Sequence, residues 1–429
     1  MRKYKIPAIL IFIISGMSFS AYGQADSLSR YIEIAGQNNP AVKAVFHTYE
    51  AALQKIPQMG ALEDPQLDMG FFLQPMELMH GRQIAQFQLM QMFPWFGVRK
   101  AARTEAQRMA QMAFESFRET RDNLFLEVYT QWYALCGLVQ KQNNNEENKK
   151  LLQQLESLVL QQNVNKSTSG MSEVLQIQIE IAELESNIES VRSELFAGKI
   201  KFNALLNRRP ESEVVLPDEI RQIPFSFNAE EIPAMIAENN PMLGMVREET
   251  AAYSAKLEME KKMSYPMFGI GLQYMLMEKK PENSPAETTG SGGSMNSMNG
   301  KDMLMPMVSV SIPIYRNKYK AARRENKLLQ QAGEEKYADT FNRLRAELYQ
   351  LKFQLDDAER KIELYRKQTT MVRSICELKS SEFLTGKSDL NAVLQIQRQL
   401  LDYRLKESDA IVNYNTLAAN IQKLVASNK

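Results

Sequence analysis

The sequence predicts a mainly α-helical chain with a small β part, organised as two copies of one long helical hairpin. Residues 174–178 and 393–397 both read Val-Leu-Gln-Ile-Gln, at a spacing of about 219 positions. Each of these segments lies at the end of a polar break, residues 163–174 in the first copy and residues 383–393 in the second. Each break follows a run of roughly seventy residues that contains no proline and a single glycine. Such runs favour long helices, and their recurrence at one spacing indicates an internal duplication.

The composition is that of a folded, exported protein. Hydrophobic residues make up 44% and charged residues 24% of the 429 positions, and the net charge is only +1, so nothing indicates nucleic-acid binding. Residues 1–23 have a basic start, an apolar run and small residues at the end, which predicts a secretory signal peptide cleaved near Gly23/Gln24. Cys136 and Cys376 are not equivalent in the two copies, and we expect buried small side chains rather than a disulfide framework.

The triplet Asn-Asn-Pro begins both copies, at residues 38–40 and again at 239–241. A proline after a polar pair ends one helix and can occupy the first turn of the next. We therefore expect a short helix over residues 26–39, followed by helices over residues 41–56 and 242–263.

Four segments alternate apolar and polar residues and are predicted as strands: residues 66–74, 83–92, 267–274 and 307–314. No run after the signal peptide reaches the ~20 apolar residues of a membrane-spanning helix, whereas these segments match the ~9–11 residues of a membrane-crossing strand. Four strands cannot close a barrel, so several chains would have to pool their strands. Three chains would give twelve strands, an even number within the range of outer-membrane barrels. The pattern alone leaves a soluble sheet as the alternative.

Each strand pair is followed by a long helix that begins with the shared sequence Lys-Ala-Ala-Arg, at residues 100–103 and 320–323. Apolar residues between 341 and 365 follow a strict 3,4 spacing, which is typical of a coiled-coil seam. At 1.5 Å per residue such helices would be on the order of 100 Å long, so they must pack side by side within and between chains. The returning helices are expected at about residues 172–207 and 388–426.

A connector with three prolines, residues 208–228, separates repeat 1 (residues 24–207) from repeat 2 (residues 229–429). The loop joining the first strand pair, residues 75–82, is short. The loop joining the second pair, residues 278–301, is long and rich in Ser, Gly and Asn, and we interpret it as a flexible external loop.

In this order, the motifs resemble the TolC-like outer membrane efflux proteins (outer membrane factors), nearest their heavy-metal efflux branch. The resemblance covers essentially the whole mature chain. It rests on the two Asn-Asn-Pro triplets, the strand exit Phe-Pro-Trp-Phe-Gly at residues 93–97, Leu-Leu-Asn-Arg at residues 205–208, and the two breaks. It implies a homotrimer in the Gram-negative outer membrane, with a twelve-stranded transmembrane β-barrel and an α-barrel of hairpins extending into the periplasm. It also implies a periplasmic end that opens on docking to a periplasmic adaptor (membrane fusion) protein and an inner-membrane pump.

The two breaks are the tips of the hairpins in this family, where a glycine is followed six residues later by an acidic residue and a valine. Here Ser167 replaces the first glycine and Ala392 replaces the second acidic residue, so an acidic gate does not carry over to Ala392. Glu173 or Asp389 could supply an acidic ring instead, or could each be an acid that meets a helix dipole. The expected adaptor-docking residues are Ser167, Gly170, Glu173, Val174, Gly386, Asp389, Ala392 and Val393, and the expected gate residues are Glu173, Asp389 and Gln395.

The sequence contains no catalytic constellation, and we expect neither an enzyme nor a cofactor. Only two histidines are present, and Gly290–Gly293 lies between predicted strands rather than before a helix. The suggestive feature is methionine, of which there are 25, because thioethers are soft ligands for ions such as Cu(I). The alternative is that these methionines fill adaptable packing sites. The candidate soft-metal contacts are Met76, Met79, His80, Met295, Met298, Met303 and Met305, with Met275, Met277 and Met307 nearby.

The leading functional hypothesis is a passive outer-membrane exit duct of a tripartite efflux system, with copper or silver as a candidate cargo. A type I secretion duct would have the same architecture. A soluble exported coiled-coil structural or adaptor protein would explain the hairpins but leave the alternating strands unused. The partners expected are further copies of the chain, the adaptor, the pump and outer membrane lipid, and no nucleic acid.

Overall fold

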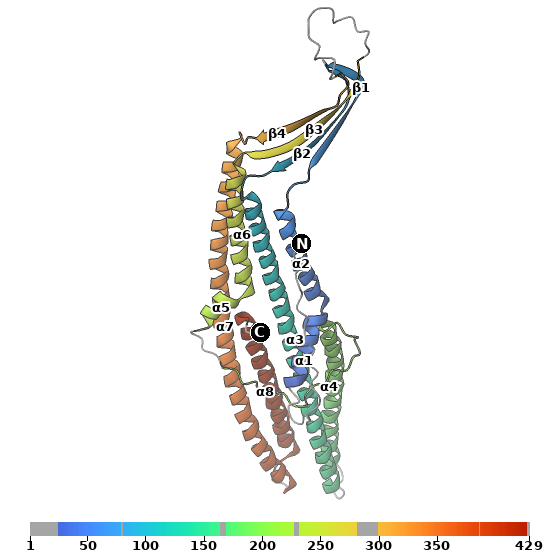
Figure 1. The fold of residues 1–429 in the computed structure, drawn as a ribbon. Coiled ribbons are helices and arrows are strands. Elements are labelled where there is room, and N and C mark those ends of the chain that lie inside the picture. The colour runs from blue at the N-terminus through green and yellow to red at the C-terminus, as the bar shows by residue number, and fades with distance from the viewer. Residues whose placement is uncertain are drawn as a thin grey trace, which may run out of the picture. The chain divides into compact units, whose positions relative to one another are not determined.

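A computed structural model describes residues 25–78, 80–163, 169–226, 231–280, 299–385 and 387–426, so the predicted signal peptide lies outside the described residues. The chain is mainly helical with four described strands, as the sequence predicts (Figure 1). In order, the elements are α1 (Ala25–Asn38), α2 (Pro40–Gly60), β1 (Gln66–Leu78), β2 (Gly81–Phe93), α3 (Val98–Asn163), α4 (Ser169–Leu205), α5 (Ile232–Asn239), α6 (Pro241–Met263), β3 (Met267–Glu278), β4 (Met303–Ser311), α7 (Arg316–Leu384) and α8 (Leu390–Val425).

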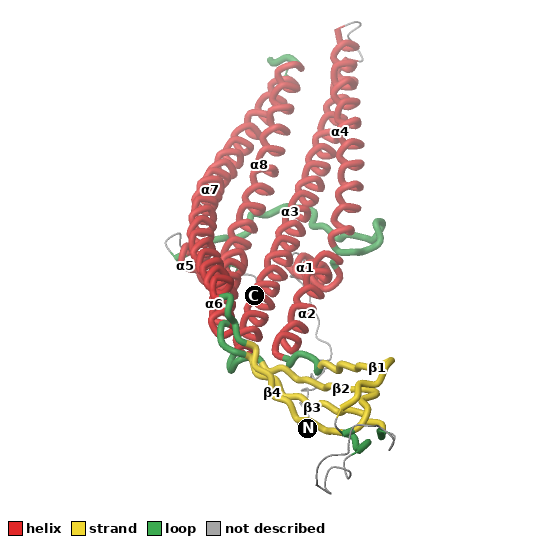
Figure 2. Tube along the Cα trace, turned by 90° about the horizontal axis from the view of Figure 1, so that it is seen from above, coloured by secondary structure: helices red, strands yellow, loops and turns green. Residues whose placement is uncertain are grey.

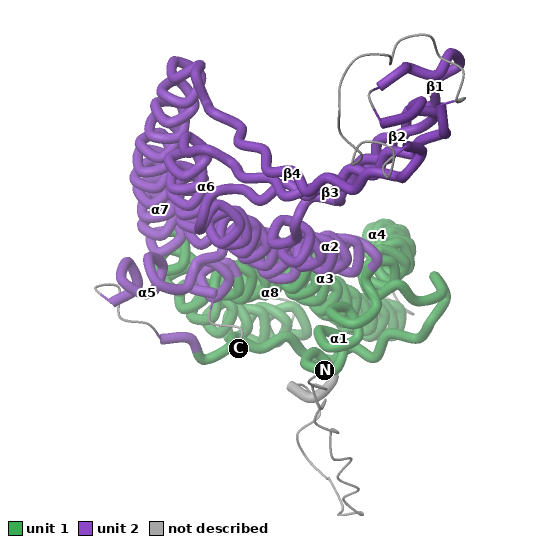
Figure 3. The backbone as a smooth tube through the Cα atoms, turned by 45° about the horizontal axis from the view of Figure 1, so that its top comes forward, with its two compact units in different colours: residues 1–39, 124–224, 354–419 green, residues 40–123, 225–353, 420–429 purple. Residues whose placement is uncertain are grey.

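The chain divides into two compact units, and each unit draws on both halves of the sequence (Figure 3). Unit 1 consists of residues 1–39, 124–224 and 354–419, and unit 2 consists of residues 40–123, 225–353 and 420–429. The division passes through α3, α7 and α8. The sequence predicts a division along the chain, into residues 24–207 and 229–429, which differs from these two spatial units; the predicted repeat boundaries stay a prediction.

The long helices are continuous. α3 and α7 have 66 and 69 residues, and α4 and α8 return with 37 and 36 residues. In unit 1, α4 lies beside α3 and α8 lies beside α7, as two hairpins (Figure 2).

No helix in the described ranges has both the length and the apolar character needed to cross a membrane.

The core at the tip of unit 1 contains residues from all four of these helices. Ile177 and Val393 have no exposed surface, and Leu390 is 2% exposed. Burial of an aliphatic side chain of this size contributes about 1.5–3 kcal/mol, so this cluster holds the two hairpins together. Its members are Leu152, Leu155, Val159, Val174, Ile177, Leu184, Phe383, Leu390, Val393 and Leu394.

The two Asn-Asn-Pro triplets make the same contact in each half of the chain. Asn39 Nδ2 donates to the carbonyl of Leu205 at the end of α4, at 2.9 Å. Asn240 Nδ2 donates at 2.9 Å to the carbonyl of Leu424 in the last turn of α8. The two acceptors are 219 positions apart, which is the spacing of the repeated Val-Leu-Gln-Ile-Gln segment. Each asparagine therefore satisfies a carbonyl that the end of a helix leaves unpaired.

The connector between the halves is extended and is held to the helices of unit 1 by two buried asparagines. Asn203 of α4 donates to the carbonyls of Pro210 and Ser212, at 2.9 and 2.8 Å. Asn415 of α8 accepts from the backbone N–H of Ile223 at 3.0 Å. Both asparagines have 0% exposure, so they fix the path of a segment whose described residues, 208–226, form no helix or strand.

The four strands form one antiparallel sheet in the order β1-β2-β3-β4. The strands β1, β2 and β3 have 12 or 13 residues and exceed the predicted ranges, so that β1 ends at Leu78 and β2 begins at Gly81. The strand β4 runs over residues 303–311 rather than the predicted 307–314. Its Pro306 is tolerated because β4 is an edge strand, where a missing N–H need not break a ladder bond.

A register shift in β1 explains how the first strand accommodates Pro75. Phe71 pairs with Ala85, and the next paired residue, Met76, faces Gln83, so β1 contains extra residues between them. Bulges are one of the few places where a strand accepts proline. The predicted strand end at residue 74 therefore lies inside this bulge and is not the end of β1.

The exit from β2 into α3 depends on the segment Phe-Pro-Trp-Phe-Gly. Trp95 stacks on Tyr265, which precedes β3, with ring centroids 5.2 Å apart. Gly97 has φ 84°, in the left-handed region that side chains with a Cβ rarely adopt. The chain can therefore leave the sheet and begin α3 one residue later.

Candidate channel wall and helical tips

One face of the sheet is apolar and exposed. Because directly paired residues of an antiparallel sheet share a face, the rows Leu67–Leu89–Leu272 and Met69–Phe87–Tyr274 define it. Leu73 in the bulge is 100% exposed and Val308 is 78% exposed. We call this the apolar face; its members are Leu67, Met69, Phe71, Ala85, Phe87, Leu89, Phe93, Phe268, Ile270, Leu272, Tyr274, Leu276, Leu304, Pro306, Val308 and Val310, together with one amide, Gln91. A contiguous apolar surface of this extent marks contact with lipid or with another protein.

The opposite face carries glutamine, methionine, serine and glycine. The rows that define it include Gln88–Gln273–Met305 and Met90–Gly271–Met307. We call it the glutamine-methionine face; its members are Gln66, Asp68, Gly70, Gln86, Gln88, Met90, Met92, Gly269, Gly271, Gln273, Met275, Met303, Met305, Met307, Ser309 and Ser311. The two faces differ because side chains alternate along every strand, and the sequence alternates with the same period.

Glutamine side chains on this face are hydrogen-bonded to one another. Gln86 Oε1 accepts from Gln273 Nε2 across β2 and β3, at 3.3 Å, and from Gln83 Nε2 at 3.4 Å. A face that carries hydrogen-bonded amide side chains is suited to contact with water and polar solutes, because placing amides against hydrocarbon costs free energy.

The structure does not bring the predicted soft-metal residues together into one site. Met76 lies exposed in β1, whereas Met303 and Met305 lie exposed in β4, at the other edge of the sheet. His80 is half-buried in the turn after β1, and its carbonyl accepts from the N–H of Gly300 at 3.0 Å. Met79, Met295 and Met298 lie outside the described residues. Within the described part of the chain, no group of three or more His, Cys, Asp or Glu side chains could hold a metal ion.

The predicted docking residues divide into buried and exposed positions. Val174 and Val393 belong to the tip core, so their side chains are packed within the chain. Glu173 and Ala392 are half-buried, and Asp389 and Gln395 are exposed. Gly170 lies in the first turns of α4, and Ser167 and Gly386 lie outside the described residues.

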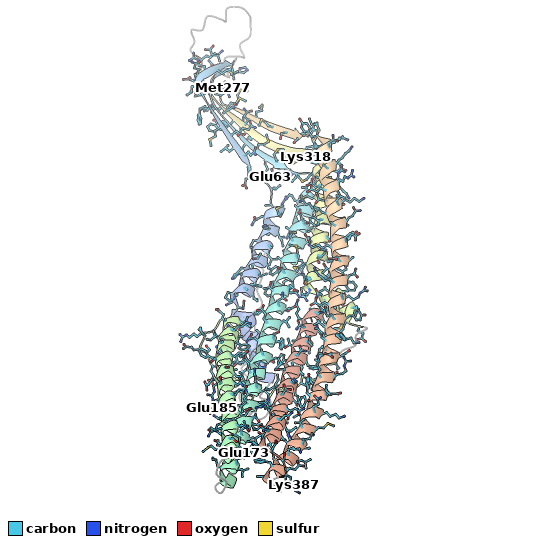
Figure 4. All side chains as sticks on the ribbon, turned by 180° about the vertical axis from the view of Figure 1, so that it is seen from behind. Glu63, Glu173, Glu185, Met277, Lys318 and Lys387 are labelled. Carbon is cyan, nitrogen blue, oxygen red and sulfur yellow. The ribbon has the colours of Figure 1, made fainter. Side chains whose placement is uncertain are left out.

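Asp389 caps a helix. Its Oδ1 accepts from the backbone N–H of Ala392 at 2.9 Å, which is the position of a residue that caps the start of α8. The sequence leaves two roles open for Asp389, a member of an acidic ring or an acid at a helix N-terminus, and this contact is the one expected of the second role. Glu173 and Lys387 lie at the same end of unit 1, so charges of both signs are present near the tips (Figure 4).

Two ion pairs join the hairpins near the tips, and neither is evident from the sequence. Arg398 Nε of α8 donates to Glu180 Oε2 of α4 at 2.9 Å, and Arg398 Nη2 donates to Glu180 Oε1. Arg404 Nη1 of α8 donates to Glu147 Oε2 of α3 at 2.8 Å. Each pair therefore links α8 of the second hairpin to a helix of the first, which local sequence patterns cannot indicate because the partners are more than two hundred residues apart.

A cluster of charges is buried in unit 2. The Asp122 side chain is 2% exposed, and its Oδ1 accepts from Arg121 Nη2 at 2.9 Å. Burial raises the pKa of Asp122, because the opposing effect of Arg121 is smaller. Nearby in the chain, Glu119 Oε1 accepts from Lys423 Nζ at 2.9 Å. The raised pKa of Asp122 makes the stability of unit 2 dependent on pH.

Comparison with known proteins gives one family and a set of similar structures. Residues 232–427 match the family described as "Outer membrane efflux protein". The solved structure of CusC is 14% identical with a TM-score of 0.73, and covers 93% of this chain and 92% of its own. The outer-membrane channel OprN is 16% identical with a TM-score of 0.72, covering 93% and 90%. The outer membrane protein VceC from Vibrio cholerae is 13% identical with a TM-score of 0.72, covering 93% and 96%.

At these identities, the similarity to solved structures concerns the fold alone. The sequence matched no curated protein.

Proposed function

We propose that the chain is an outer-membrane channel, the exit duct of a tripartite efflux system, on the premise that residues 232–427 match the outer membrane efflux protein family. It would lie in the Gram-negative outer membrane, extend into the periplasm and conduct its cargo passively. The chain itself would carry out no catalysis.

The observation that carries this proposal is the sheet with one exposed face that is apolar except for Gln91. A soluble adaptor would leave side chains such as Phe71 (70% exposed) and Ile270 (63% exposed) in water. In a membrane wall, the same side chains contact lipid, and the glutamine-methionine face lines an aqueous lumen. The alternating strands therefore favour a channel over an exported structural protein.

The open edges of the sheet support a homotrimer. β1 and β4 each have one unpaired edge, and unsatisfied backbone groups in lipid cost several kcal/mol each. Three copies that pair β4 of one chain with β1 of the next would close a barrel of twelve strands, an even number within the range of outer-membrane barrels.

The helical hairpins would form the periplasmic part of the duct and receive a periplasmic adaptor and an inner-membrane pump. Exposed apolar side chains near the tip of α4, Met171 (67% exposed) and Ile179 (66% exposed), offer a surface for packing with neighbouring hairpins or with the adaptor. Among the residues expected at the tips, Asp389 and Gln395 are exposed and can take part directly, whereas Val174 and Val393 would act by shaping the tip core.

We include soft metal ions, copper or silver, as the proposed cargo class. Support comes from the methionines of the glutamine-methionine face, which point away from the apolar face and hence away from the proposed lipid contact.

The test is fractionation of the expressed protein, followed by determination of the protein mass in the detergent-solubilised particle and by conductance in planar bilayers. We expect a membrane-bound species near three times the mass of one processed chain, with discrete conductance steps. A soluble monomer or dimer would refute the channel.

A further inference from the structure

Two methionines of β2 converge on a serine of β4, across the strand between them. The Ser309 hydroxyl lies 3.6 Å from Met90 Sδ and 3.4 Å from Met92 Sδ, and it can donate to either sulfur. The three residues belong to the glutamine-methionine face. Two thioether sulfurs and a hydroxyl oxygen therefore meet at one place on this face.

Two glycines of β3 make room for this convergence. Met90 pairs with Gly271 and Met92 pairs with Gly269. A Cβ on Gly269 would lie 2.5 Å from Met92 Sδ and 3.2 Å from Met90 Sδ, and a Cβ on Gly271 would lie 3.0 Å from Met90 Sδ. Glycine weakens the interior of a strand and often marks a place where another group approaches closely. The groups that approach Gly269 here are the Ser309 hydroxyl oxygen, which lies nearest, and the two sulfurs, which both lie within 3.2 Å of one point above Gly269.

A third thioether lies in the same row of the sheet. Met307 of β4 pairs with Gly271 from the side opposite to Met90, so two methionines flank a position that has no side chain. All three methionines are half-buried rather than fully packed. Because methionine has three rotatable side-chain bonds, small rotations can bring its sulfur to a shared ligand.

The surroundings distinguish this cluster from hydrophobic packing. The apolar face contains a single methionine, Met69, so methionine is concentrated on the polar side of the sheet. A thioether is a weak hydrogen-bond acceptor and a good ligand for soft ions. Sulfur atoms gathered beside a glutamine network are therefore better suited to an ion than to lipid.

We propose that Met90, Met92 and Met307 form a binding site for a soft monovalent cation, Ag(I) or Cu(I), on the glutamine-methionine face. Ser309 holds the two β2 thioethers in place when no ion is bound, and the sulfur lone pairs turn to the ion when it binds. The proposed site would give the channel a specific contact with its cargo. It rests on the proposed function only in that the glutamine-methionine face is taken to line the lumen. Binding itself requires no pump and no adaptor.

The experiment measures binding of silver nitrate to the purified, detergent-solubilised full chain by calorimetry in chloride-free buffer. The test variant is Met90→Leu/Met92→Leu, which nearly conserves side-chain volume. The matched control is Met69→Leu/Met371→Leu, which replaces two exposed methionines, one on the apolar face and one on α7. X-ray absorption at the silver edge reports whether sulfur is bound to the ion.

We expect the test variant to weaken silver binding by roughly tenfold or more and to reduce the sulfur signal, and we expect the control to bind as the wild type does. Equal binding by the test variant and the wild type would overturn the site, as would silver without sulfur ligands in the wild type. The particle mass and bilayer conductance of the same samples report on the channel. A silver-binding protein that is not a membrane trimer would refute the proposed function and leave the site standing.

Discussion

The ion pair between Glu180 and Arg398 leads to a measurable prediction about opening of the tips. The pair links α4 to α8, so the two hairpins can separate at this level only if it breaks. The Glu180 side chain is 13% exposed and that of Arg398 is 65% exposed, so solvent screens the pair and it contributes about 1 kcal/mol at most. In a trimer whose three pairs break together, the sum is about 3 kcal/mol, which corresponds to a roughly hundredfold change in the ratio of open to closed channels.

The perturbation is Arg398→Ala, and the assay is open probability in planar bilayers. We expect the variant to open up to roughly a hundred times more often than the wild type at low salt, and the difference to shrink as salt screens the wild-type pair. The matched control is Arg366→Ala, because Arg366 pairs with Glu407 at 3.3 Å within a single hairpin. Its loss leaves the link between hairpins intact and should not change the open probability.

A double-mutant cycle separates the pair from general damage at the tip. If the ion pair carries the effect, Glu180→Ala/Arg398→Ala should open no more often than either single variant, and the exchange Glu180→Arg/Arg398→Glu should restore closure. Additive single effects, or an Arg398→Ala channel that gates like the wild type, would refute the reasoning.

Three further predictions concern stability and reactivity. Burial raises the pKa of Asp122 in the folded state above its ordinary value of 3.8. At a pH between the unfolded-state pKa and the folded-state pKa, the folded protein therefore binds more protons than the unfolded protein. The free energy of unfolding falls as pH rises through this window and stays lower at higher pH. Asp122→Asn should remove this slope and raise the melting temperature at neutral pH, and an unchanged pH profile would contradict the assignment. Burial raises the pKa of Cys136 to about 12, so iodoacetamide at pH 8 should leave Cys136 unmodified in the folded protein. Burial also raises the pKa of the half-buried Cys376, which should react slowly with the same reagent, and peptide mass mapping would measure both reactions. Asn240→Ala leaves the carbonyl of Leu424 without its donor and should lower the free energy of unfolding by about 2 kcal/mol, with Asn240→Asp intermediate because it keeps an acceptor for the helix cap, as measured by denaturant titration.

Local patterns in the sequence were enough to predict the elements and their duplication. Helices of 66 and 69 residues follow from long runs without proline, since each turn is stabilised by neighbours within four residues. The two faces of the sheet follow from the alternation of residues such as those in β3, since the side-chain period of a strand is two. The repeat spacing of 219 positions also predicts which helix ends are equivalent, and the contacts of Asn39 and Asn240 with Leu205 and Leu424 agree with it.

Strand ends and side-chain partners depend on the tertiary structure. The alternation of residues predicted the last strand over residues 307–314, but β4 begins at Met303 because an edge strand accepts Pro306. The convergence of Met90 and Met92 on Ser309 depends on the pairing of three strands and on glycines in the middle one. These contacts join residues far apart in the chain, and only the register of packed elements brings such residues together. The sequence by itself therefore determined the periodic elements and the channel-like fold, whereas the contacts between distant residues, which carry the tip pair and the proposed thioether site, were decided by the tertiary structure.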